Sequence, residues 1–356
     1  MARKRSPART WASQGWPARV ATALTAVAIA SGAMAQTGEK VRVGWVPAMV
    51  SSPLMIAREK GYFKQAGIDL ELESVTTATD AMAHVGTNRM QVLEGGVQAN
   101  YFNALASKYP IVIAGDRAST PLGHLVMIRP DLKDDIKSLK DLKGRTISIA
   151  GAGSIIAYEM DKLLQTVGLS LKDTNVKVLP VPQLPVAFAN KVIDAADVYA
   201  PMTHQLEQQK IAVRLMDPDD VLTNMVVAVS IINTDWAKDK PAVVEAFFFA
   251  LLRGTRDYCQ AYHGGKNRQE VIEILMKTGI EKRPDILALP WPSRRATGLV
   301  DPAAIRDVHD WYRANGFVKG EVPLDRLVDN KYVAAANAKL GPFQIENAAS
   351  KIPGCR

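Results

Sequence analysis

The sequence is poor in the residues that build metal and nucleophilic sites. It has two cysteines, Cys259 and Cys355, and its histidines are spread over positions 84, 124, 204, 263 and 309 without ligand spacing. It also lacks a Gly-x-Ser-x-Gly elbow and a cysteine–histidine catalytic signature. These absences predict a protein that is not an enzyme and that has no catalytic residue, no metal site and no cofactor.

Long hydrophobic runs are missing as well. The apolar run Val20–Ala30 has 11 residues, which is too short for a hydrocarbon core of about 30 Å. It follows five arginine and lysine residues and precedes the small-x-small site Ala33-Met34-Ala35. Residues 1–35 are therefore predicted to be a secretory signal peptide. No later segment has about 18 consecutive apolar residues, so we expect a soluble monomer in the periplasm.

Excess charge of one sign is also absent from the mature chain. The signal peptide holds 5 of the 44 Lys and Arg residues and none of the 36 Asp and Glu residues, so the mature chain has a net charge of about +3. The remaining charges form mixed-sign runs such as "RPDLKDDIKSLKDLKGR". A nucleic-acid-binding protein needs a dense basic patch, and we therefore expect no nucleic-acid partner.

What the sequence does contain is two series of strand-like runs alternating with helical segments. A length of 356 residues with 47% hydrophobic residues suits two packed cores. Alternation of this kind predicts right-handed crossovers and mainly parallel sheets, and the region after about residue 241 reads as helical. The strands are predicted at 41–46, 69–75, 90–96, 111–115, 124–128, 145–150, 175–179, 194–199 and 212–216, with a further buried strand at 225–232.

Two helix starts follow strands and are candidates for holding an anion. In "WVPAMVSSPLMIAREKGYF", Ser51, Ser52 and Pro53 predict a helix start, because serine caps the first turn and proline suits its first position. In "AGAGS", glycines let the backbone approach a ligand, and Ser154 is the predicted N-cap. Free amides and the partial positive charge of a helix start attract anions. Simple capping with no ligand is an equally good interpretation of Ser154. The first helix start alone carries little functional weight, because almost every strand–helix unit has one.

Several longer segments resemble a known family. They are "VRVGWVPAMVSSPLMIAREKGYFKQAGIDLELE", "DLKGRTISIAGAGSIIAYEMDKLLQTVGL", "KVIDAADVYAPM" and "DPAAIRDVHDWYRANGFVKGEVPLDRLVDNKYV". The chain resembles the solute-binding proteins of ABC importers in the taurine, alkanesulfonate and nitrate class, a branch shared with thiamine-precursor binding proteins. The resemblance implies an α/β fold of two lobes (type II-like), each a mainly parallel sheet flanked by helices, with the ligand in the cleft between them. It also implies ABC permease and ATPase subunits in the inner membrane as partners and a small organic anion as ligand.

Two other functions stay open on the same fold. The thiamine-pyrimidine synthases resemble this family, but they depend on a cysteine-rich motif and on a lysine that holds pyridoxal phosphate. A periplasmic sensor module would bind the same ligand and differ only in its partner. The two-cysteine composition and the export signal favour the importer over the enzyme.

The chain is expected to cross between the two lobes twice, near residues 119–130 and 219–231. Lobe one would then be residues 40–122 and 231–356, and lobe two residues 123–230. Ligands of open α/β sheets bind beyond the carboxyl ends of the strands. This rule, together with residue chemistry, selects eight ligand-binding residues: Trp45, Ser51, Ser52, Gln98, Arg117, Ser154, Asp197 and Tyr199.

Some individual residues have more than one interpretation. Arg117 is predicted to lie just past a strand end, where it could grip a carboxylate or sulfonate, or could instead pair with Asp116 in an exposed loop. Asp197 could belong to an anion-binding site only by holding Arg117 in place. It could also accept a hydrogen bond from the amine of a zwitterionic ligand. The stretch 290–295 is predicted to be a solvated connection. The two cysteines either form a disulfide or remain a buried thiol and a thiol on the tail.

Overall fold

The structure is a computed structural model that describes residues 38–75, 78–289, 291, 294–345 and 355. The predicted signal peptide lies outside the described residues. The described residues belong to one compact unit, Thr37–Arg356. None of the described helices combines the length and the apolarity needed to cross a bilayer.

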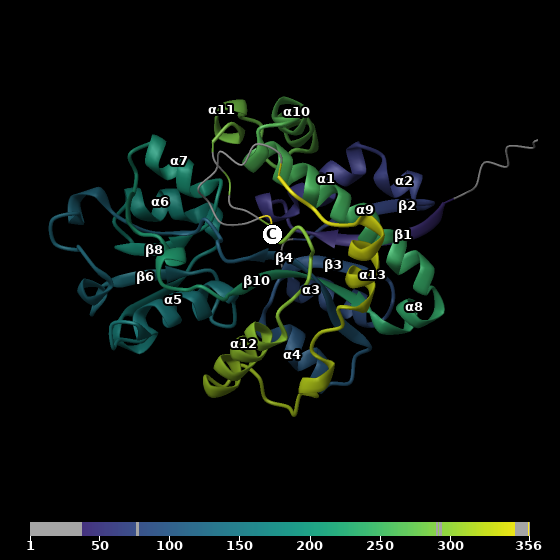
Figure 1. Cartoon of the computed structure of the whole chain (residues 1–356). Coiled ribbons are helices and arrows are strands. Elements are labelled where there is room, and N and C mark those ends of the chain that lie inside the picture. The colour runs from purple at the N-terminus through teal and green to yellow at the C-terminus, as the bar shows by residue number, and fades with distance from the viewer. Residues whose placement is uncertain (1–37, 76–77, 290, 292–293, 346–354, 356) are drawn as a thin grey trace, which may run out of the picture. The chain divides into compact units, whose positions relative to one another are not determined.

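Two five-stranded sheets organise this unit (Figure 1). The first has the order β2 (Ile68–Ser74), β1 (Glu39–Trp45), β3 (Val92–Gly96), β10 (Val226–Asn233) and β4 (Ile111–Ser119). The second has the order β7 (Asn175–Val178), β6 (Thr146–Ile149), β8 (Ala195–Val198), β5 (Leu125–Ile128) and β9 (Val213–Met216).

Each sheet contains one reversed strand. β10 is antiparallel to both β3 and β4, and β5 is antiparallel to both β8 and β9, whereas the other pairs are parallel. β5 and β10 are also the strands at which the chain enters a sheet after leaving the other one. The predicted α/β class with mainly parallel sheets is confirmed, with one exception per sheet.

The helices lie between and around these strands. They are α1 (Ser52–Glu59), α2 (Tyr62–Gln65), α3 (Ala78–Gly86), α4 (Ala99–Ala106), α5 (Ile155–Gln165), α6 (Leu184–Ala189), α7 (Met202–Gln208), α8 (Thr234–Asp239), α9 (Pro241–Cys259), α10 (Arg268–Thr278), α11 (Pro284–Leu287), α12 (Pro302–Ala314) and α13 (Lys331–Leu340). Short 3-10 turns are η1 (Met49–Ser51), η2 (Pro130–Leu132), η3 (Leu139–Leu142), η4 (Leu171–Asp173), η5 (Val181–Gln183), η6 (Pro218–Asp220) and η8 (Leu324–Arg326), and η7 (Gln260–Gly264) is a π-helical turn.

Each predicted strand is present, and after β10 the described residues form helices and loops, as predicted. The largest difference concerns β4, which was predicted to end at residue 115 and continues to Ser119. This extension pairs with β10, and the pairing contains register shifts. The strand therefore continues beyond the end of the apolar run.

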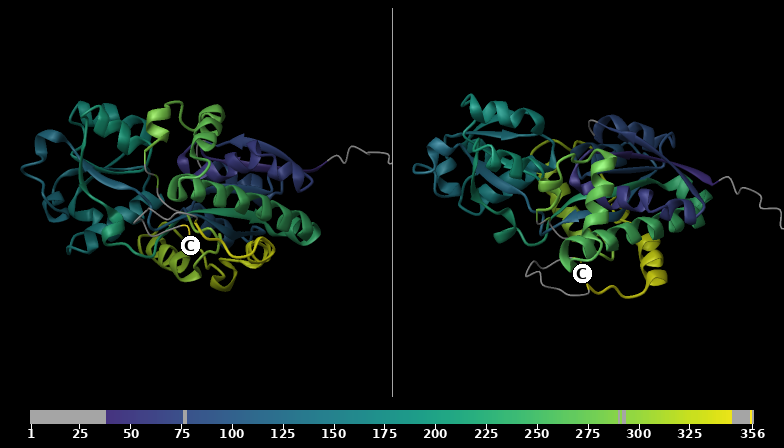
Figure 2. Two further views of the ribbon diagram at one scale, coloured as in Figure 1. Left: turned by 45° about the horizontal axis from the view of Figure 1, so that its top comes forward. Right: turned by 90° about the horizontal axis from the view of Figure 1, so that it is seen from above.

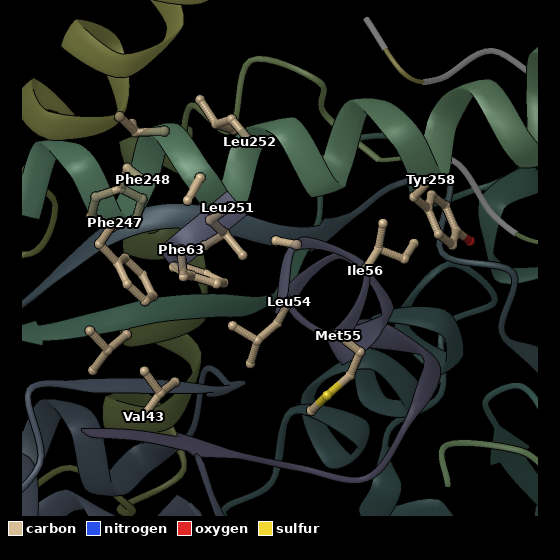
Figure 3. Packing of buried hydrophobic residues seen from close by; sticks show 14 of the residues in the cluster. Val43, Leu54, Met55, Ile56, Phe63, Phe247, Phe248, Leu251, Leu252 and Tyr258 are labelled. Carbon is tan, nitrogen blue, oxygen red and sulfur yellow. The ribbon is translucent and has the colours of Figure 1, made fainter. Parts of the chain in front are cut away.

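The core of the first sheet has two sides. Val43, Val92 and Ala114 face a cluster built from α1 and α9, whereas Leu93 and Ile113 face a second cluster built from α3, α4 and α12. Figure 3 shows how α9 side chains such as Phe247 and Leu251 pack against Leu54 and Phe63. Burying each large apolar side chain contributes about 1.5–3 kcal/mol, so this sheet is held between two helical layers.

α1 and α9 approach each other closely because α9 carries a glycine at the crossing. A Cβ atom placed on Gly254 would lie 2.2 Å from the carbonyl oxygen of Pro53 and 2.8 Å from the Cβ of Ala57. Glycine is therefore required at this position for the two helix backbones to come this near. On another side of α9 lies α13, seen beside it in Figures 1 and 2.

The second sheet is covered in the same way. Val126 and Ile147 face Met160 and Leu163 of α5, and the opposite face of the sheet packs against α6 and α7. α5 also contacts α12 from the C-terminal region: Tyr158 donates to Asp307 over 2.6 Å, and the Nε1 atom of Trp311 donates to Asp161 over 2.7 Å.

Two connections join the sheets and lie side by side. Residues 120–124 lead from β4 to β5, and residues 217–225 lead from β9 to β10. The carboxylate of Asp219 accepts hydrogen bonds from the amides of Leu122 and Gly123, over 2.7 and 2.9 Å. Thr120 and Met225 exchange a backbone hydrogen bond and a hydroxyl hydrogen bond. The two connections therefore support each other.

Cys259 and Cys355 form a disulfide, with their Cα atoms 5.7 Å apart and a sequence separation of 96. Of the two possibilities left open by the sequence, the bridge is the one found. It fastens Cys355, near the C-terminus, to the end of α9.

Candidate functional site

Loops from the two sheets meet at the carboxyl ends of β3 and β6. The amide of Ala99, which begins α4, donates to the carbonyl of Gly153 over 3.3 Å. A Cβ atom on Gly153 would lie 3.3 Å from that of Ala99, and one on Gly96 would lie 3.6 Å from Ile155. Small residues in the glycine loop thus permit this contact between a first-sheet loop and a second-sheet loop.

The start of α5 matches its sequence prediction. Ser154 has extended backbone angles, and its hydroxyl oxygen accepts a hydrogen bond from the amide of Ala157 over 3.2 Å. Ser154 is therefore the N-cap, as predicted. Gln98 occupies the equivalent position before α4, where its half-buried side chain makes no capping hydrogen bond.

The start of α1 differs from the prediction in its details. Ser51 occupies the N-cap position and Ser52 is already the first helical residue. Both serines are buried. The hydroxyl of Ser51 donates to the carbonyl of Val46 over 2.8 Å, and that of Ser52 contacts the sulfur of Met49 at 3.4 Å. Their hydroxyls contact the preceding loop, and neither makes a side-chain capping hydrogen bond. The helix start is confirmed, and the binding of a ligand by these serines stays a prediction.

Arg117 is also placed differently from the prediction. It lies within β4, only 3% exposed, and its Nε atom is 2.8 Å from Oε2 of Glu94 on β3. The hydroxyl of Ser230 on β10 donates to Oε1 of the same carboxylate over 2.6 Å. The expected position past a strand end and the exposed pairing with Asp116 are both wrong, because β4 extends to Ser119 and β3 supplies a buried counter-charge.

A second buried carboxylate lies next to this pair. Asp116 is 3% exposed, and its Oδ2 atom is 3.9 Å from Nε of Arg295. Burial raises the pKa of Asp116 to about 6, although the neighbouring Arg295 opposes the shift. Burial likewise raises the pKa of Glu94 in spite of the Arg117 guanidinium. The carboxyl end of β4 is therefore a buried charged region.

Asp197 belongs to a different buried cluster, in the second sheet. Nδ1 of His124 lies 2.9 Å from Oε2 of Glu159 and 3.9 Å from Oδ1 of Asp197. Burial alone would lower the pKa of His124, but Glu159 and Asp197 outweigh it and raise the pKa to about 9. Burial, reinforced by Glu159, raises the pKa of Asp197 well above its ordinary value. Asp197 thus pairs with a histidine instead of Arg117.

The predicted aromatic residues border these groups. Tyr199 is half-buried, and its ring centroid lies 5.9 Å from that of His124. Trp45 is half-buried at the end of β1, where its backbone pairs with that of Glu94. The predicted residues therefore fall into two groups: Tyr199, Asp197 and Ser154 belong to the second sheet and its helices, and the others to the first.

Four functional candidates were missed by sequence reasoning: Glu94, Ser230, His124 and Glu159. Glu94 had a signal, because a carboxylate inside the apolar run "MQVLEGG" needs a buried partner. The cluster of His124, Glu159 and Asp197 had none, since its members come from a connection, a helix and a strand that are far apart in sequence.

In the stretch predicted to be a solvated connection, Trp291 and Arg294 are in fact buried and Arg295 is half-buried. Trp291 is 1% exposed and donates its Nε1–H to the carbonyl of Leu287 over 3.2 Å. Arg294 is buried with its guanidinium carbon 5.2 Å from the ring centroid of Tyr258. The aromatic core around α9 explains the burial of this basic segment.

Comparison with known proteins finds similarity to binding proteins and to synthases. A family model described as "NMT1/THI5 like" matches residues 49–261. The 4-amino-5-hydroxymethyl-2-methylpyrimidine phosphate synthase of Schizosaccharomyces pombe is 26% identical over 132 residues, which are 36% of each chain. The nitrate/nitrite binding protein NrtA of a Nostoc species is 23% identical over 259 residues, 66% of this chain and 56% of that protein. The chain thus spans about a third and about half of these relatives.

A solved structure gives the same fold. The periplasmic aliphatic sulphonate binding protein SsuA from Escherichia coli aligns with a TM-score of 0.69 at 16% sequence identity. The alignment covers 89% of this chain and 98% of that one. The two α/β sheets with their two connections are therefore those of the periplasmic binding protein fold.

Proposed function

The chain belongs to the NMT1/THI5-like family, and on this premise we propose that it is the solute-binding protein of an ABC importer. It captures a small organic anion in the periplasm and delivers it to a membrane permease. In this proposal, residues 40–122 and 231–356 form one lobe and residues 123–230 the other. The signal peptide at residues 1–35 directs the chain to the periplasm.

One observation carries this proposal: the loop after β3 and the glycine loop after β6 touch across the two sheets, between Ala99 and Gly153. A ligand seated beside this contact would interact with both lobes. Such a ligand favours a closed arrangement over an open one by its contacts to the second lobe. This is the behaviour that an importer needs from its binding protein.

The charge of the ligand is inferred from the helix starts. The N-terminus of α5, with Ser154 as its cap, and that of α4, with Gln98 before it, both lie at this contact. Backbone amides at helix N-termini favour a negative group such as a sulfonate or carboxylate. Arg117 already has Glu94 as its counter-charge, so the amides, Gln98 and Ser154 supply the anion contacts in this proposal. Trp45 and Tyr199 would enclose the organic part.

A second candidate function is the binding of a thiamine-pyrimidine precursor. It is favoured by the relative that acts as a pyrimidine phosphate synthase and by the buried carboxylates Asp197 and Glu159, which could accept from a ring amine. A synthase activity is less well supported, because both cysteines are joined in the disulfide. A sensor module differs only in its partner.

A thermal-shift screen of the chain without residues 1–35 tests the ligand class. The panel consists of taurine, longer alkanesulfonates, nitrate, aromatic carboxylates and aminopyrimidines. A ligand at 100 times its dissociation constant adds about 2.7 kcal/mol to the free energy of unfolding. Shifts with sulfonates or carboxylates support the proposed anion, and shifts with aminopyrimidines alone support the second candidate. A blank panel contradicts both.

A matched pair of variants then tests the location. Ser154→Ala should weaken binding of the active compound in calorimetry, because it removes the cap of α5. Ser170→Ala removes a comparable capping hydroxyl in η4, remote from the contact between the loops. Equal affinities for the two variants would remove the start of α5 from the site.

A further inference from the structure

Three ligating side chains converge inside the second sheet. His124 ends the connection into β5, Asp197 lies in β8, and Glu159 lies one turn into α5. The exposed fractions of these residues are 8%, 2% and 0%. One nitrogen or oxygen atom from each of them lies within 4.8 Å of the other two. Each belongs to a different element, so packing of the second lobe brings them together.

Three of the four carboxylate oxygens in this cluster lack hydrogen-bond donors within the described part of the chain, whereas Oε2 of Glu159 lies 2.9 Å from Nδ1 of His124. Neither carboxylate oxygen of Asp197 has a hydrogen-bond partner among the described residues, and the same holds for Oε1 of Glu159. An unsatisfied buried carboxylate costs free energy. Asp197 points into the cluster, with Oδ1 at 3.9 Å from Nδ1 of His124. A group that supplies positive charge at this point would satisfy all three oxygens.

The spacing of the atoms suits a metal ion. Zinc bound at about 2.1 Å places the ligand atoms of a tetrahedron about 3.4 Å apart. The distances from Nδ1 of His124 to Glu159 and to Asp197 are 2.9 and 3.9 Å, on either side of this value. Metal binding displaces the proton of the imidazole, and the two carboxylates then carry two negative charges, which equal the charge of a divalent ion. One imidazole and two carboxylates suit zinc or manganese better than calcium or magnesium.

The position of His124 is fixed by its neighbours. The preceding residues Leu122 and Gly123 donate their amides to Asp219, on the returning connection. The ring of Tyr199 lies beside the imidazole. The imidazole of His124 is therefore already oriented for an ion at the cluster. Such an ion would link the connection at residues 120–124 to β8 and α5.

We propose that His124, Glu159 and Asp197 bind one divalent transition-metal ion, which ties the first connection to the second lobe. In the anion-binding proposal the solute contacts are the amides, Gln98 and Ser154, and none of the three ion ligands is among them. Under the second candidate function, the ion and a pyrimidine would compete for Asp197 and Glu159. The ion has a structural role in this proposal. It contributes no chemistry to a reaction.

Calorimetry with zinc chloride on the chelator-stripped wild-type chain tests the site. We expect one ion per chain, together with a rise in the melting temperature and much weaker binding of calcium and magnesium. Cobalt(II) bound to the wild-type chain should show the visible absorption of a four- or five-coordinate site. This spectrum requires no variant, so it remains decisive if a substitution prevents folding.

Three variants localise the ion. Asp197→Asn and His124→Gln keep the side-chain size and should each weaken zinc binding at least about 100-fold, because each removes one of three protein ligands. Asp161→Asn is the matched control, since Asp161 is a buried carboxylate on the same helix that is bonded to Trp311 and Leu171. It should leave zinc affinity unchanged. Absence of stoichiometric binding by the wild type, or unchanged affinity in both ligand variants, overturns the proposal in favour of a proton shared by the carboxylates.

Discussion

The Nε atom of Arg117 lies 2.8 Å from the carboxylate of Glu94, and both side chains are almost completely buried. The two residues come from β4 and β3, which β10 separates in the sheet. Ser230, on that intervening strand, donates to the same carboxylate. The pair therefore spans three strands of the first sheet and makes a structural contribution there.

Removing one partner of this pair should be costly. Arg117→Ala leaves Glu94 buried without a counter-charge, and we expect the free energy of unfolding to fall by about 3–5 kcal/mol. The double variant Arg117→Met, Glu94→Gln removes both charges and should recover part of this loss. Urea denaturation of the three proteins measures the difference. A loss below about 1 kcal/mol in the single variant would mean that the pair is solvated.

The pH dependence of stability should contain a contribution from Asp116. Its pKa is about 6 in the folded chain because of burial and close to 3.9 when unfolded. The folded state thus binds more protons between these values, and the free energy of unfolding falls as pH rises through this range. The shift of about two units corresponds to roughly 3 kcal/mol at most. Relative to the wild type, Asp116→Asn should gain stability between pH 4 and 7.

Asp131→Asn provides the control for this measurement. The exposed Asp131 has a lowered pKa, chiefly because of its hydrogen bond with Lys191. A lowered pKa contributes stability above the unfolded pKa, and that stability disappears as the pH falls through the folded pKa. Asp131→Asn should therefore differ from the wild type with the opposite slope and only below about pH 4, whereas the slope of Asp116→Asn lies between about pH 4 and 6. Parallel slopes would contradict the assignment of the raised pKa to Asp116.

Loss of the disulfide should destabilise the chain. In the chain-entropy account, a loop of about 100 residues is worth up to about 4.7 kcal/mol, and measured values are typically about 2–4 kcal/mol. Cys355→Ser leaves Cys259 in its buried position and should reduce the free energy of unfolding by this amount. Dithiothreitol should lower the wild-type melting temperature to that of the variant. A variant that melts with the oxidised wild type would exclude the bridge.

Gly254→Ala tests the close crossing of α1 and α9. Alanine favours a helix interior over glycine by about 1 kcal/mol, so a spacious site would be stabilised by the substitution. Here the added Cβ would meet the backbone of Pro53, and overpacking of this kind costs about 1–3 kcal/mol. We expect net destabilisation in thermal unfolding. Gly151→Ala, whose Cβ would lie 3.8 Å from the nearest side-chain atom, should be tolerated.

The inner strands β3, β8 and β10 were predictable because their residues are buried on both faces. β10, for example, is buried at each of its eight positions, and its run "VVAVSIIN" reads as a strand directly. The end of β4 was not predictable in this way, since Asp116 and Arg117 interrupt the apolar pattern. Their burial depends on Glu94 and Arg295, which lie elsewhere in the sequence.

The candidate site was only partly accessible from the sequence for a related reason. Capping by Ser154 is a local property of a few residues, and the prediction was correct. The partners of Arg117 and Asp197 are set by strand order and helix packing, which local patterns do not determine. Histidine spacing along the chain likewise contained no information about His124, because its neighbours Glu159 and Asp197 come from later elements.

The place of β10 in the first sheet has a consequence for the order of assembly during synthesis. All strands of the second sheet lie between Leu125 and Met216, so that sheet is complete in one stretch of nascent chain. The first sheet receives its β10 strand, between β3 and β4, only when synthesis reaches Asn233. Until then β3 and β4 have unpaired edges that could pair with other chains. The first sheet contains the most N-terminal strands, but it is therefore completed after the second sheet.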